Sequence, residues 1–550
     1  MNYGVFDIEA YNWNEIYAIG YYSNTKISIC KDKLESNNQY IEYLLSQIDK
    51  PIVYAHNGGA YDFLFIMDYI KDNPKIKVSK FVLINSKIIS FKIKFNGKSI
   101  TFKDSYAILP SSLYNLTKSF DVKHKKLRLD YELGIKDNRF NEYFRNDLIG
   151  LYEVLIESGL THKLTIASNS INIFKNEYYK YGTFSRNSDK IDNFFRLAYK
   201  GGRVELIKTY GEGLYYYDIN SLYPYVMQQY QYPLIQRNNY ELTKEYIPNI
   251  CGIYECNVKL DYIYIPLLHT TLNNKMIYPY GTFKGYYTNR EIEKALKLGY
   301  KIEVIKGYTF NNTEYIFKDY VDYYYNIKKN NEGSKKEIAK LLLNSLYGKF
   351  GQKRNMIKYS INPIKNIKNN EFLTIFNNMG ISKTKSYNFY SNFLHSELSA
   401  LITANARLKL YELIERAGMN NVYYYDTDSI ITSYQLNTSA NLGDIKKVAN
   451  IDEFIGISAK LYAYKNKDGI HITAKGFNIS ELKYNDFLDA HKGDLSKIHT
   501  SKEVIRKFRN SIISHSSNFS EIYKLDRTLI NQYSKRIIDK NGIDTKPIKV

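Results

Sequence analysis

The chain has 550 residues, too many for a single hydrophobic core, so about two to four domains are expected. Its 77 Lys and Arg residues outnumber its 56 Asp and Glu residues, and the formal net charge of +21 favours a polyanionic partner such as nucleic acid over a merely basic surface. Three cysteines argue against a disulfide framework and a zinc site, and no apolar stretch is long enough to span a membrane.

The N-terminal part of the chain, roughly its first 160 residues, has the pattern of an α/β unit. Residues 3–9 and 51–55 have the composition of strands. Residues 141–158 have helical periodicity, and Gly159 stands where a helix would end. Strands mixed with helices, with acidic residues at the ends of elements, indicate an α/β unit.

Two hairpins and a basic tail are expected further along. Residues 316–350 have the pattern of a helical hairpin whose second helix opens with a capping box, Ser334 with Glu337, and closes at Gly348. Residues 421–432 have the pattern of a β-hairpin with an acidic turn. The stretch after about residue 495 is basic and is expected to be helical.

Two acidic strand ends in the middle of the chain could serve phosphoryl transfer. This chemistry uses two divalent cations, and such hard cations prefer carboxylate ligands. Asp218 stands in YYYDINSLYPYV, and Asp426 and Asp428 stand in YYYDTDS. Asp426 and Asp428 are two residues apart, so a strand would place both on one face.

The second helix of the expected hairpin carries a polar stripe. Lys336, Lys340, Asn344 and Tyr347 are four, four and three residues apart, so they share one helical face. Such a stripe suits an incoming nucleotide, with the lysines on the triphosphate and Tyr347 against the base. A solvated amphipathic face is an equally good interpretation of this helix taken alone.

A second acidic set lies in the N-terminal part. It comprises D-I-E at residues 7–9, H-N-G-G-A-Y-D at residues 56–62 and Y-F-R-N-D at residues 143–147. Two metals that activate a water for phosphodiester cleavage need about four carboxylates. The set supplies these in Asp7, Glu9, Asp62 and Asp147. Tyr143 precedes Asp147 by one helical turn, where its phenol could orient the attacking water.

In this order, the segments resemble a known enzyme family. D-x-x-S-L-Y-P, K-x-x-x-N-S-x-Y-G and Y-x-D-T-D-S resemble motifs A, B and C of family B DNA polymerases, and the earlier acidic set resembles the three motifs of the proofreading 3′–5′ exonuclease. The resemblance implies Mg²⁺ or Mn²⁺, two per active site, with Asp218 and Asp428 as polymerase ligands and Asp426 beside them. It also implies that Tyr223 lies under the nucleotide sugar and excludes a ribose 2′-hydroxyl.

The resemblance also implies DNA contacts near the exonuclease. Residues matching positions that hold the single-stranded primer end are Asn57, Tyr61, Phe65 and Leu113. Lys126, in K-L-R-L-D-Y, matches a contact to the scissile phosphate by a looser alignment. Ala10 departs from the pattern, because relatives often carry a hydroxyl residue there, and this puts the efficiency of proofreading in doubt.

Three further motifs are similar to the protein-primed branch, which includes small bacteriophage replicases and polymerases of linear mitochondrial plasmids. They are Y-K-G-G, with Tyr199, Gly201 and Gly202; T-A-N-A-R, with Thr403 and Arg407; and K-L-Y, with Lys460 and Tyr462. In the branch these are a linker motif, a template contact and a motif near the primer terminus. The resemblance implies a terminal protein as priming partner.

The implied fold is a multidomain α+β architecture. An N-terminal RNase H-like exonuclease domain precedes a right-hand polymerase with a palm, short helical-hairpin fingers, a small thumb and two insertions. The expected boundaries are 1–163 for the exonuclease, 164–227 for the first part of the palm, 228–315 for the first insertion, which would contact terminal protein and DNA, 316–350 for the fingers, 351–394 for the second insertion, 395–494 for the second part of the palm and 495–550 for the thumb.

The expected function is a DNA-directed DNA polymerase with proofreading, acting as a monomer on template-primer DNA and deoxynucleoside triphosphates. Two alternatives remain, a non-catalytic nucleic-acid-binding replication factor with a degenerate palm and a nuclease with a vestigial palm. The N-terminus MNYGVFDIEA lacks the pattern of a signal or presequence. A soluble protein is expected, in a mitochondrion or a virus-infected host cell, and the sequence does not choose between these two locations.

Overall fold

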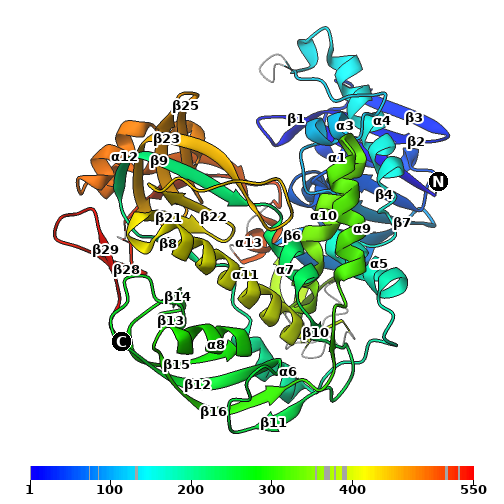
Figure 1. Ribbon diagram of the computed structural model, residues 1–550. Coiled ribbons are helices and arrows are strands. Elements are labelled where there is room, and N and C mark those ends of the chain that lie inside the picture. Colours follow the sequence, from blue (N-terminus) through cyan, green and yellow to red (C-terminus); the bar gives the residue numbers. More distant parts are fainter. Residues whose placement is uncertain are drawn as a thin grey trace.

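The computed structural model describes most of the chain (Figure 1). It describes residues 2–73, 75–84, 86–129, 134–352, 356–363, 372–376, 379–386, 393–513, 518–530 and 533–550, with backbone only for 356–363, 372–376, 379–386 and 512–513. Most side chains of the expected second insertion, 351–394, therefore lie outside the described residues. Within the described part, no helix is both long enough and apolar enough to cross a membrane.

The N-terminal unit is built on a seven-stranded sheet in the order β3-β2-β1-β4-β7-β6-β5. Its strands are β1 (Tyr3–Tyr11), β2 (Glu15–Ser23), β3 (Lys26–Lys31), β4 (Ile52–Ala55), β5 (Lys77–Ile84), β6 (Lys87–Phe95) and β7 (Lys98–Asp104). β1 runs antiparallel to β2 and parallel to β4. The expected strands and the α/β character of this part are confirmed.

Three main helices cover this sheet. They are α1 (Asn37–Gln47), α2 (Asp62–Asp72) and α4 (Phe140–Ser158), and the short α3 (Leu113–Ser119) lies beside α4. Helix α4 ends at Gly159, whose φ of 62° is the left-handed conformation that glycine adopts without a Cβ clash. α4 packs closely on β2, because a Cβ atom at Gly20 would lie 2.6 Å from the Leu148 side chain. This packing brings α4 over the carboxylates of β1.

A second seven-stranded sheet forms the central unit, in the order β25-β24-β23-β9-β22-β21-β8. Its strands are β8 (Val204–Leu206), β9 (Tyr210–Ile219), β21 (Val422–Asp426), β22 (Ser429–Thr432), β23 (Ile445–Ser458), β24 (Leu461–Asn466) and β25 (Gly469–Ala474). The expected β-hairpin at residues 421–432 is therefore confirmed as β21–β22. β22 pairs with β9, and this pairing places Ser429 opposite Asp218.

Five further helices come from residues 166–229 and 318–350. They are α5 (Ile166–Ile173), α6 (Asp189–Ala198), α7 (Leu222–Gln229), α9 (Lys318–Asn330) and α10 (Gly333–Phe350). α9 and α10 form the expected helical hairpin (Figure 1).

The expected capping box of the second helix is wrong, because α10 begins at Gly333 after Glu332, with no side-chain cap. Gly333 makes the turn with a φ of 60°, so Ser334 already lies inside the helix. Gly348 does not close it, because buried Phe350 carries the helix further into the core.

Residues 228–315 contain a separate four-stranded sheet, in the order β11-β16-β12-β15. Its strands are β11 (Glu241–Thr243), β12 (Gly252–Leu260), β15 (Gly281–Thr288) and β16 (Lys301–Thr309). Helix α8 (Asn289–Lys297) packs on this sheet and opens with a capping box formed by Thr288 and Glu291. α8 also contacts α11 (Ser396–Ala417), the long buried helix of the central unit.

The expectation of a helical segment after residue 495 is wrong. That part consists mainly of two hairpins, β26 (His499–Ile505) with β27 (Ile522–Thr528) and β28 (Arg536–Ile538) with β29 (Thr545–Pro547). Among the described residues of this part, one helix is longer than a single turn. It is α13 (Phe508–Ile513), which lies between β26 and β27. The β26–β27 hairpin has no face that is fully buried, so its sequence lacks the alternation of apolar and polar residues that marks a half-buried strand.

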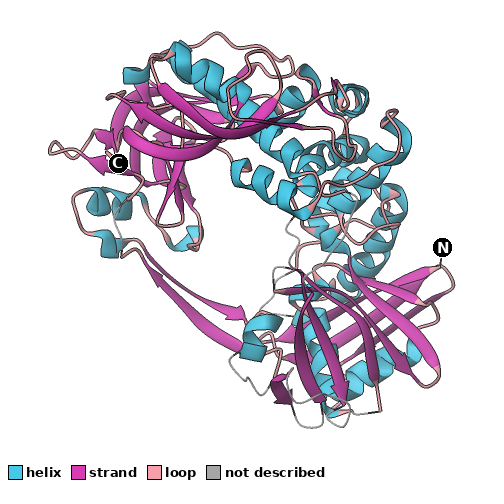
Figure 2. Ribbon diagram, turned by 90° about the horizontal axis from the view of Figure 1, so that it is seen from below, coloured by secondary structure: helices cyan, strands magenta, loops and turns pink. Residues whose placement is uncertain are grey.

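The β26–β27 hairpin reaches from the central unit to the N-terminal unit (Figure 2). There the Asp68 carboxylate of α2 accepts hydrogen bonds from the Phe519 amide, at 2.7 Å, and from the Ser520 amide, at 3.1 Å. Phe508 and Phe519 are buried in the core of the N-terminal unit. The tip of the β26–β27 hairpin is therefore docked on the N-terminal unit.

Candidate active sites

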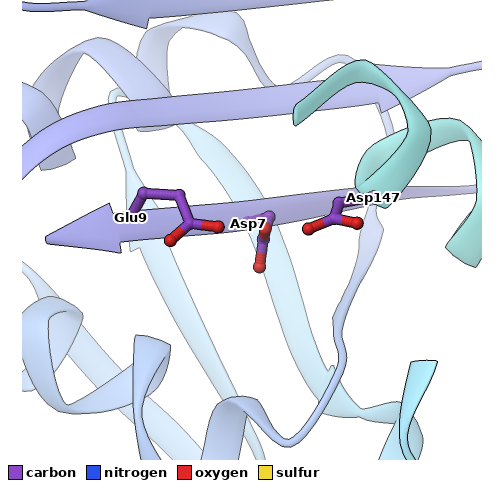
Figure 3. Close-up of side chains that lie close together, drawn as sticks. All are labelled: Asp7, Glu9 and Asp147. Atoms are coloured by element: carbon purple, nitrogen blue, oxygen red, sulfur yellow. The ribbon is translucent and has the colours of Figure 1, made fainter. Parts of the chain in front are cut away.

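Three carboxylates meet on the N-terminal sheet. Asp7 and Glu9 project from the same side of β1, and Asp147 approaches them from α4 (Figure 3). One oxygen from each lies within 4.8 Å of the others. The alternation of side chains along a strand places Asp7 and Glu9 together, and the packing of α4 on the sheet supplies Asp147. The predicted grouping of these three acids is found in the structure.

Asp62 completes the acidic set from the first residue of α2. Its side chain is buried and accepts a hydrogen bond from the Ile8 amide at 3.1 Å. Burial raises the pKa of Asp62 to about 8 and that of Glu9 to about 7, and burial together with the charge of Asp62 raises the pKa of Asp7 well above its usual value. These are the shifts of buried carboxylates whose mutual repulsion is only partly offset by the positive charge of Lys126.

The donor set fits a divalent cation. Asp147 is buried, yet its Oδ1 atom has no hydrogen-bond partner among the described residues. A buried carboxylate oxygen without a partner costs free energy unless a cation or water meets it. Asp7, Glu9 and Asp147 supply oxygen ligands of the kind that Mg²⁺ and Mn²⁺ prefer.

A lysine and a tyrosine are built into this N-terminal site. The Lys126 ammonium donates to the Asp147 carboxylate and, at 3.1 Å, to the Tyr143 hydroxyl. That hydroxyl in turn donates to Glu9 at 2.9 Å. The Lys126 amide donates to the Thr117 hydroxyl at 3.1 Å, which fixes the loop that carries the lysine. Both residues named from the sequence thus contact the carboxylates directly.

A cavity of about 770 Å³ opens over these carboxylates. It is lined by Asp7, Glu9, Asp62, Lys126 and Tyr143 together with Trp13, His56, Asn57, Tyr61 and Glu503. Of the four residues expected to hold a primer end, Asn57 and Tyr61 line the cavity. Phe65 is buried against Tyr61, with ring centroids 5.3 Å apart, and Leu113 is buried in the core, and neither lines the cavity. Trp13 and Glu503 were not predicted.

The central site brings Asp218 near Asp428. Asp218 is the last residue but one of β9, and Asp428 lies in the turn between β21 and β22, where the Ile219 amide donates to its backbone carbonyl at 2.6 Å. Thr427, between the two turn acids, has a φ of 58°. Burial, followed by the charge of Asp218, raises the pKa of Asp428 to about 6. The two carboxylates predicted as polymerase ligands are therefore close enough for the charge of Asp218 to affect Asp428.

Two lysines are paired with these central acids. Lys446 Nζ lies 3.0 Å from Asp218 Oδ1, and Lys460 Nζ lies 2.8 Å from Asp426 Oδ2. The Lys460 amide also donates to the Tyr424 hydroxyl, and Tyr462 packs against the Tyr424 ring at 4.8 Å. Both residues of the K-L-Y motif are thus anchored to β21. Asp426 is paired with Lys460, whereas Asp428 interacts with Asp218, so the two acids of the turn have different partners.

The polar stripe of α10 has the predicted geometry. Lys336, Lys340 and Asn344 are exposed. At the base of the stripe the Tyr347 ring stacks on Tyr223, with centroids 4.3 Å apart and planes 13° apart. The stripe and the tyrosine that follows Asp218 therefore meet at one place.

A further lysine, Lys328, was missed by the sequence prediction. It lies on α9, and its Nζ donates to the Ser221 hydroxyl at 2.6 Å. Burial and the charges of Lys446, Lys340 and Lys336 lower its pKa. Lysines from two helices and from β23 therefore surround the region beside Asp218. Spacing along one helix could not reveal Lys328, because it comes from the other arm of the hairpin.

The Y-K-G-G segment and α11 contact each other. The Arg407 guanidinium donates to the Lys200 and Gly201 carbonyls at 3.0 and 3.2 Å, and it pairs with Glu291 at 2.8 Å. Thr403 is buried, and its hydroxyl donates to the Ser399 carbonyl. The side chains expected as template contacts are thus engaged inside the protein. The Tyr199 ring is partly buried and lies close to Gly351.

Comparison with known proteins identifies similar sequences. The sequence pattern of the family described as "DNA polymerase type B, organellar and viral" matches residues 44–156 and 137–405. A "Probable DNA polymerase" of Podospora anserina is 29% identical over 99% of this chain and 58% of its own length. The "DNA-directed DNA polymerase" of Enterobacteria phage PRD1 is 25% identical over 80% of this chain and 78% of its own length. The chain spans about half to three fifths of the length of the first fungal relatives it matches, with 58% for Neurospora intermedia and 48% for Ascobolus immersus.

A solved structure has the same fold. It is "Phi29 DNA polymerase complexed with primer-template DNA and incoming nucleotide substrates", which superposes with a TM-score of 0.74, covers 96% of this chain and 99% of its own, and is 20% identical in sequence. This likeness confirms the multidomain α+β class that the sequence predicted.

Proposed function

Since the chain belongs to the organellar and viral type B DNA polymerases, we propose that it is a DNA-directed DNA polymerase that extends a primer with deoxynucleoside triphosphates. The observation that carries the proposal is the pairing of β9 with β22, which sets Asp218 beside Asp428 at the foot of a lysine-rich helical hairpin. A carboxylate pair next to several lysines suits a triphosphate with its metal ions.

Each part of the central site has a separate task in this proposal. Lys336 and Lys340 from α10 and Lys328 from α9 bind the triphosphate, and the Tyr223–Tyr347 stack forms the floor for the sugar and base. Asp218 and Asp428 would hold Mg²⁺ or Mn²⁺, which would supply positive charge to the phosphates and to the primer 3′-hydroxyl. The lysines that pair with Asp218 and Asp426 would exchange these partners for phosphate oxygens when substrates bind.

We propose a second activity, 3′–5′ exonuclease proofreading, at the N-terminal site. The support is the cluster of Asp7, Glu9 and Asp147 with the orphaned Asp147 oxygen, under a cavity large enough for a nucleotide. Asp62, buried at the start of α2, adds the fourth carboxylate. Tyr143, tied to Glu9, positions the attacking water, and Lys126 meets the scissile phosphate.

Paired variants test both activities. Asp428→Asn is expected to abolish extension of a labelled primer with Mg²⁺ while the shortening of a single-stranded oligonucleotide continues. Asp62→Ala is expected to do the reverse. Asp468→Asn, a change at an exposed carboxylate of the β24–β25 turn, is the matched control and should leave both activities in place. Normal extension by Asp428→Asn would refute the central-site assignment, and no extension by the wild-type chain would favour a non-catalytic replication factor.

Protein priming is a third part of the proposal. It is supported by the Y-K-G-G segment, held by Arg407, and by the separate sheet within residues 228–315, which would be the surface for a terminal protein. The test is incorporation of a labelled nucleotide into a covalent protein product when the cognate terminal protein is supplied. Absence of that product with an authentic partner would refute priming while leaving primer extension intact. The fungal and phage origin of the relatives supports an organelle or an infected cell as the place of action.

The division into domains follows from the same proposal. The exonuclease would occupy residues 1–163, the palm 164–227 and 395–494, the fingers 316–350 and the thumb 495–550, with insertions at 228–315 and 351–394. The two seven-stranded sheets and the α9–α10 hairpin fall within the first three of these parts. In this assignment the thumb consists mainly of hairpins, whereas the sequence predicted helices there.

A further inference from the structure

Trp13 occupies an unusual backbone position. It is the only tryptophan in the chain and lies in the tight turn between β1 and β2, where the Asn14 amide donates to the Tyr11 carbonyl at 3.1 Å. Both central residues are left-handed, with φ of 48° at Asn12 and 63° at Trp13. Turns of this kind strongly prefer Asn followed by Gly, and a bulky residue is an outlier at the second position. The turn keeps a large ring where glycine would be less strained.

The Trp13 ring is presented to solvent at the edge of the N-terminal site. Its side chain is 58% exposed, and it meets the Tyr61 ring edge to face with centroids 5.9 Å apart. Trp13 and Tyr61 line the cavity over the carboxylates, and both also line a neighbouring groove of about 250 Å³. The two aromatic rings therefore stand where the cavity continues into the groove.

One wall of that groove comes from the docked β26–β27 hairpin. Glu503, Val504 and Ile505 of β26 and Ile522 of β27 form it, and Trp13 and Tyr61 line the same groove. An aromatic ring and aliphatic side chains that line one groove offer apolar surface to a flat base. The Glu503 carboxylate repels phosphate, so a bound strand would turn its bases, and not its backbone, towards this wall.

We propose that Trp13 is a stacking platform for a base of the single-stranded 3′ end that enters the N-terminal site. The inference rests on the proposed exonuclease and adds a specificity-determining residue to it. Unpaired bases stack on exposed aromatic rings without regard to sequence, whereas bases inside a duplex are already stacked on each other. Trp13 would therefore favour frayed or mismatched primer ends over paired ones.

The strained turn allows stacking to be separated from folding. Trp13→Gly gives the turn the residue it prefers, so the melting temperature should stay the same or rise. The same change removes the ring, so the affinity for a single-stranded oligonucleotide should fall about tenfold. In the exonuclease reaction this loss should appear as a raised KM with kcat retained. Trp13→Phe keeps a ring and should bind within about threefold of the wild type. Tyr434→Ala, at another exposed aromatic residue, is the matched control.

A direct binding measurement uses the intrinsic fluorescence of the single tryptophan. The full chain is titrated in EDTA, which prevents cleavage, with a short oligo(dT) or with a blunt hairpin duplex, and binding is followed in parallel by the anisotropy of a label on the DNA. Quenching by oligo(dT), and weaker quenching by the duplex at equal occupancy, is expected. Unchanged fluorescence at saturating oligo(dT), or tight oligo(dT) binding by Trp13→Gly, would overturn the proposal.

These outcomes are independent of the proposed exonuclease activity. If the wild-type chain does not shorten oligonucleotides, the proposed activity fails, while the quenching measured without catalysis still decides whether Trp13 contacts a single strand. If shortening is normal and Trp13→Gly leaves KM unchanged, the exonuclease stands and the stacking platform is refuted.

Discussion

Gly202 lies directly against Thr427, since a Cβ atom at Gly202 would come 2.5 Å from Thr427 Oγ1 and 2.9 Å from Thr427 Cβ. The Thr427 amide donates to the neighbouring Arg203 carbonyl at 2.8 Å. The segment that enters β8 is therefore packed under the turn that presents Asp428. This contact gives the Y-K-G-G motif a mechanical role in the central site.

Gly202→Ala is expected to displace this turn. The nearest Thr427 atoms include its Cβ, so rotation of the side chain alone does not relieve the clash. Primer extension should fall by about 10- to 100-fold, because small misplacements of catalytic groups cost that much. Single-stranded exonuclease activity should persist. Gly201→Ala is the matched control, since a Cβ atom there would meet nothing within 4 Å. Equal extension by both variants would contradict the role of the contact.

The Tyr223–Tyr347 stack should select the sugar of the incoming nucleotide. Tyr223→Val removes the ring that would exclude a ribose 2′-hydroxyl, so the preference for deoxynucleotides over ribonucleotides should fall by at least about tenfold. Tyr223→Phe keeps the ring and should retain the preference. The ratio of kcat/KM for a matched pair such as dCTP and CTP measures this, and an unchanged ratio in Tyr223→Val would place the steric filter elsewhere.

Arg407 should contribute mainly to stability. Arg407→Ala leaves the Glu291 carboxylate buried without its cation, so urea unfolding should show a loss of about 3 kcal/mol. Lys294→Ala breaks a pair with Glu415 in which both side chains are partly exposed and should cost less than about 1 kcal/mol. If the two variants were equally stable and Arg407→Ala alone weakened template binding, a direct template contact would be the better assignment.

The docked hairpin should affect how long the enzyme stays on DNA. Asp68→Ala removes two backbone hydrogen bonds and a third from the Ser520 hydroxyl at 2.7 Å, each contributing about 1 kcal/mol. Shorter products per binding event are expected when a primed single strand is extended in the presence of a DNA trap. Asp72→Ala, one helical turn away, is the charge-matched control. Products of wild-type length from Asp68→Ala would show that docking does not limit dissociation.

The chemistry of the two sites could be predicted from the sequence better than the surfaces around them. Asp7, Glu9 and Asp147, and likewise Asp218 and Asp428, were predictable because metal-dependent phosphoryl transfer demands carboxylates and strand spacing restricts where they stand. Trp13 gave no such signal, because its importance comes from a left-handed turn and from a groove whose other wall is far along the chain.

The C-terminal part was mispredicted for a related reason. Its hairpin strands expose both faces and carry charged residues, a composition that also suits a solvated helix. The β26–β27 hairpin is held in place by the burial of Phe508 and Phe519 in the N-terminal core and by hydrogen bonds to Asp68 of α2, between residues more than 400 positions apart. The local periodicity of a sequence does not predict contacts between such distant residues, so this contact is seen only in the folded chain.

The docked hairpin also closes the molecule into a ring of packed elements, which runs from the central sheet through α10 to the N-terminal unit and back through β26–β27 (Figure 2). A linear strand bound inside such a ring would be able to enter or leave by its end. A covalently closed circle offers no end, so it could be encircled only after the docked segment had separated from the N-terminal unit. The strength of this docking, which combines the hydrogen bonds of Asp68 with the burial of Phe508 and Phe519, would thus set how readily the enzyme loads onto circular DNA compared with linear DNA.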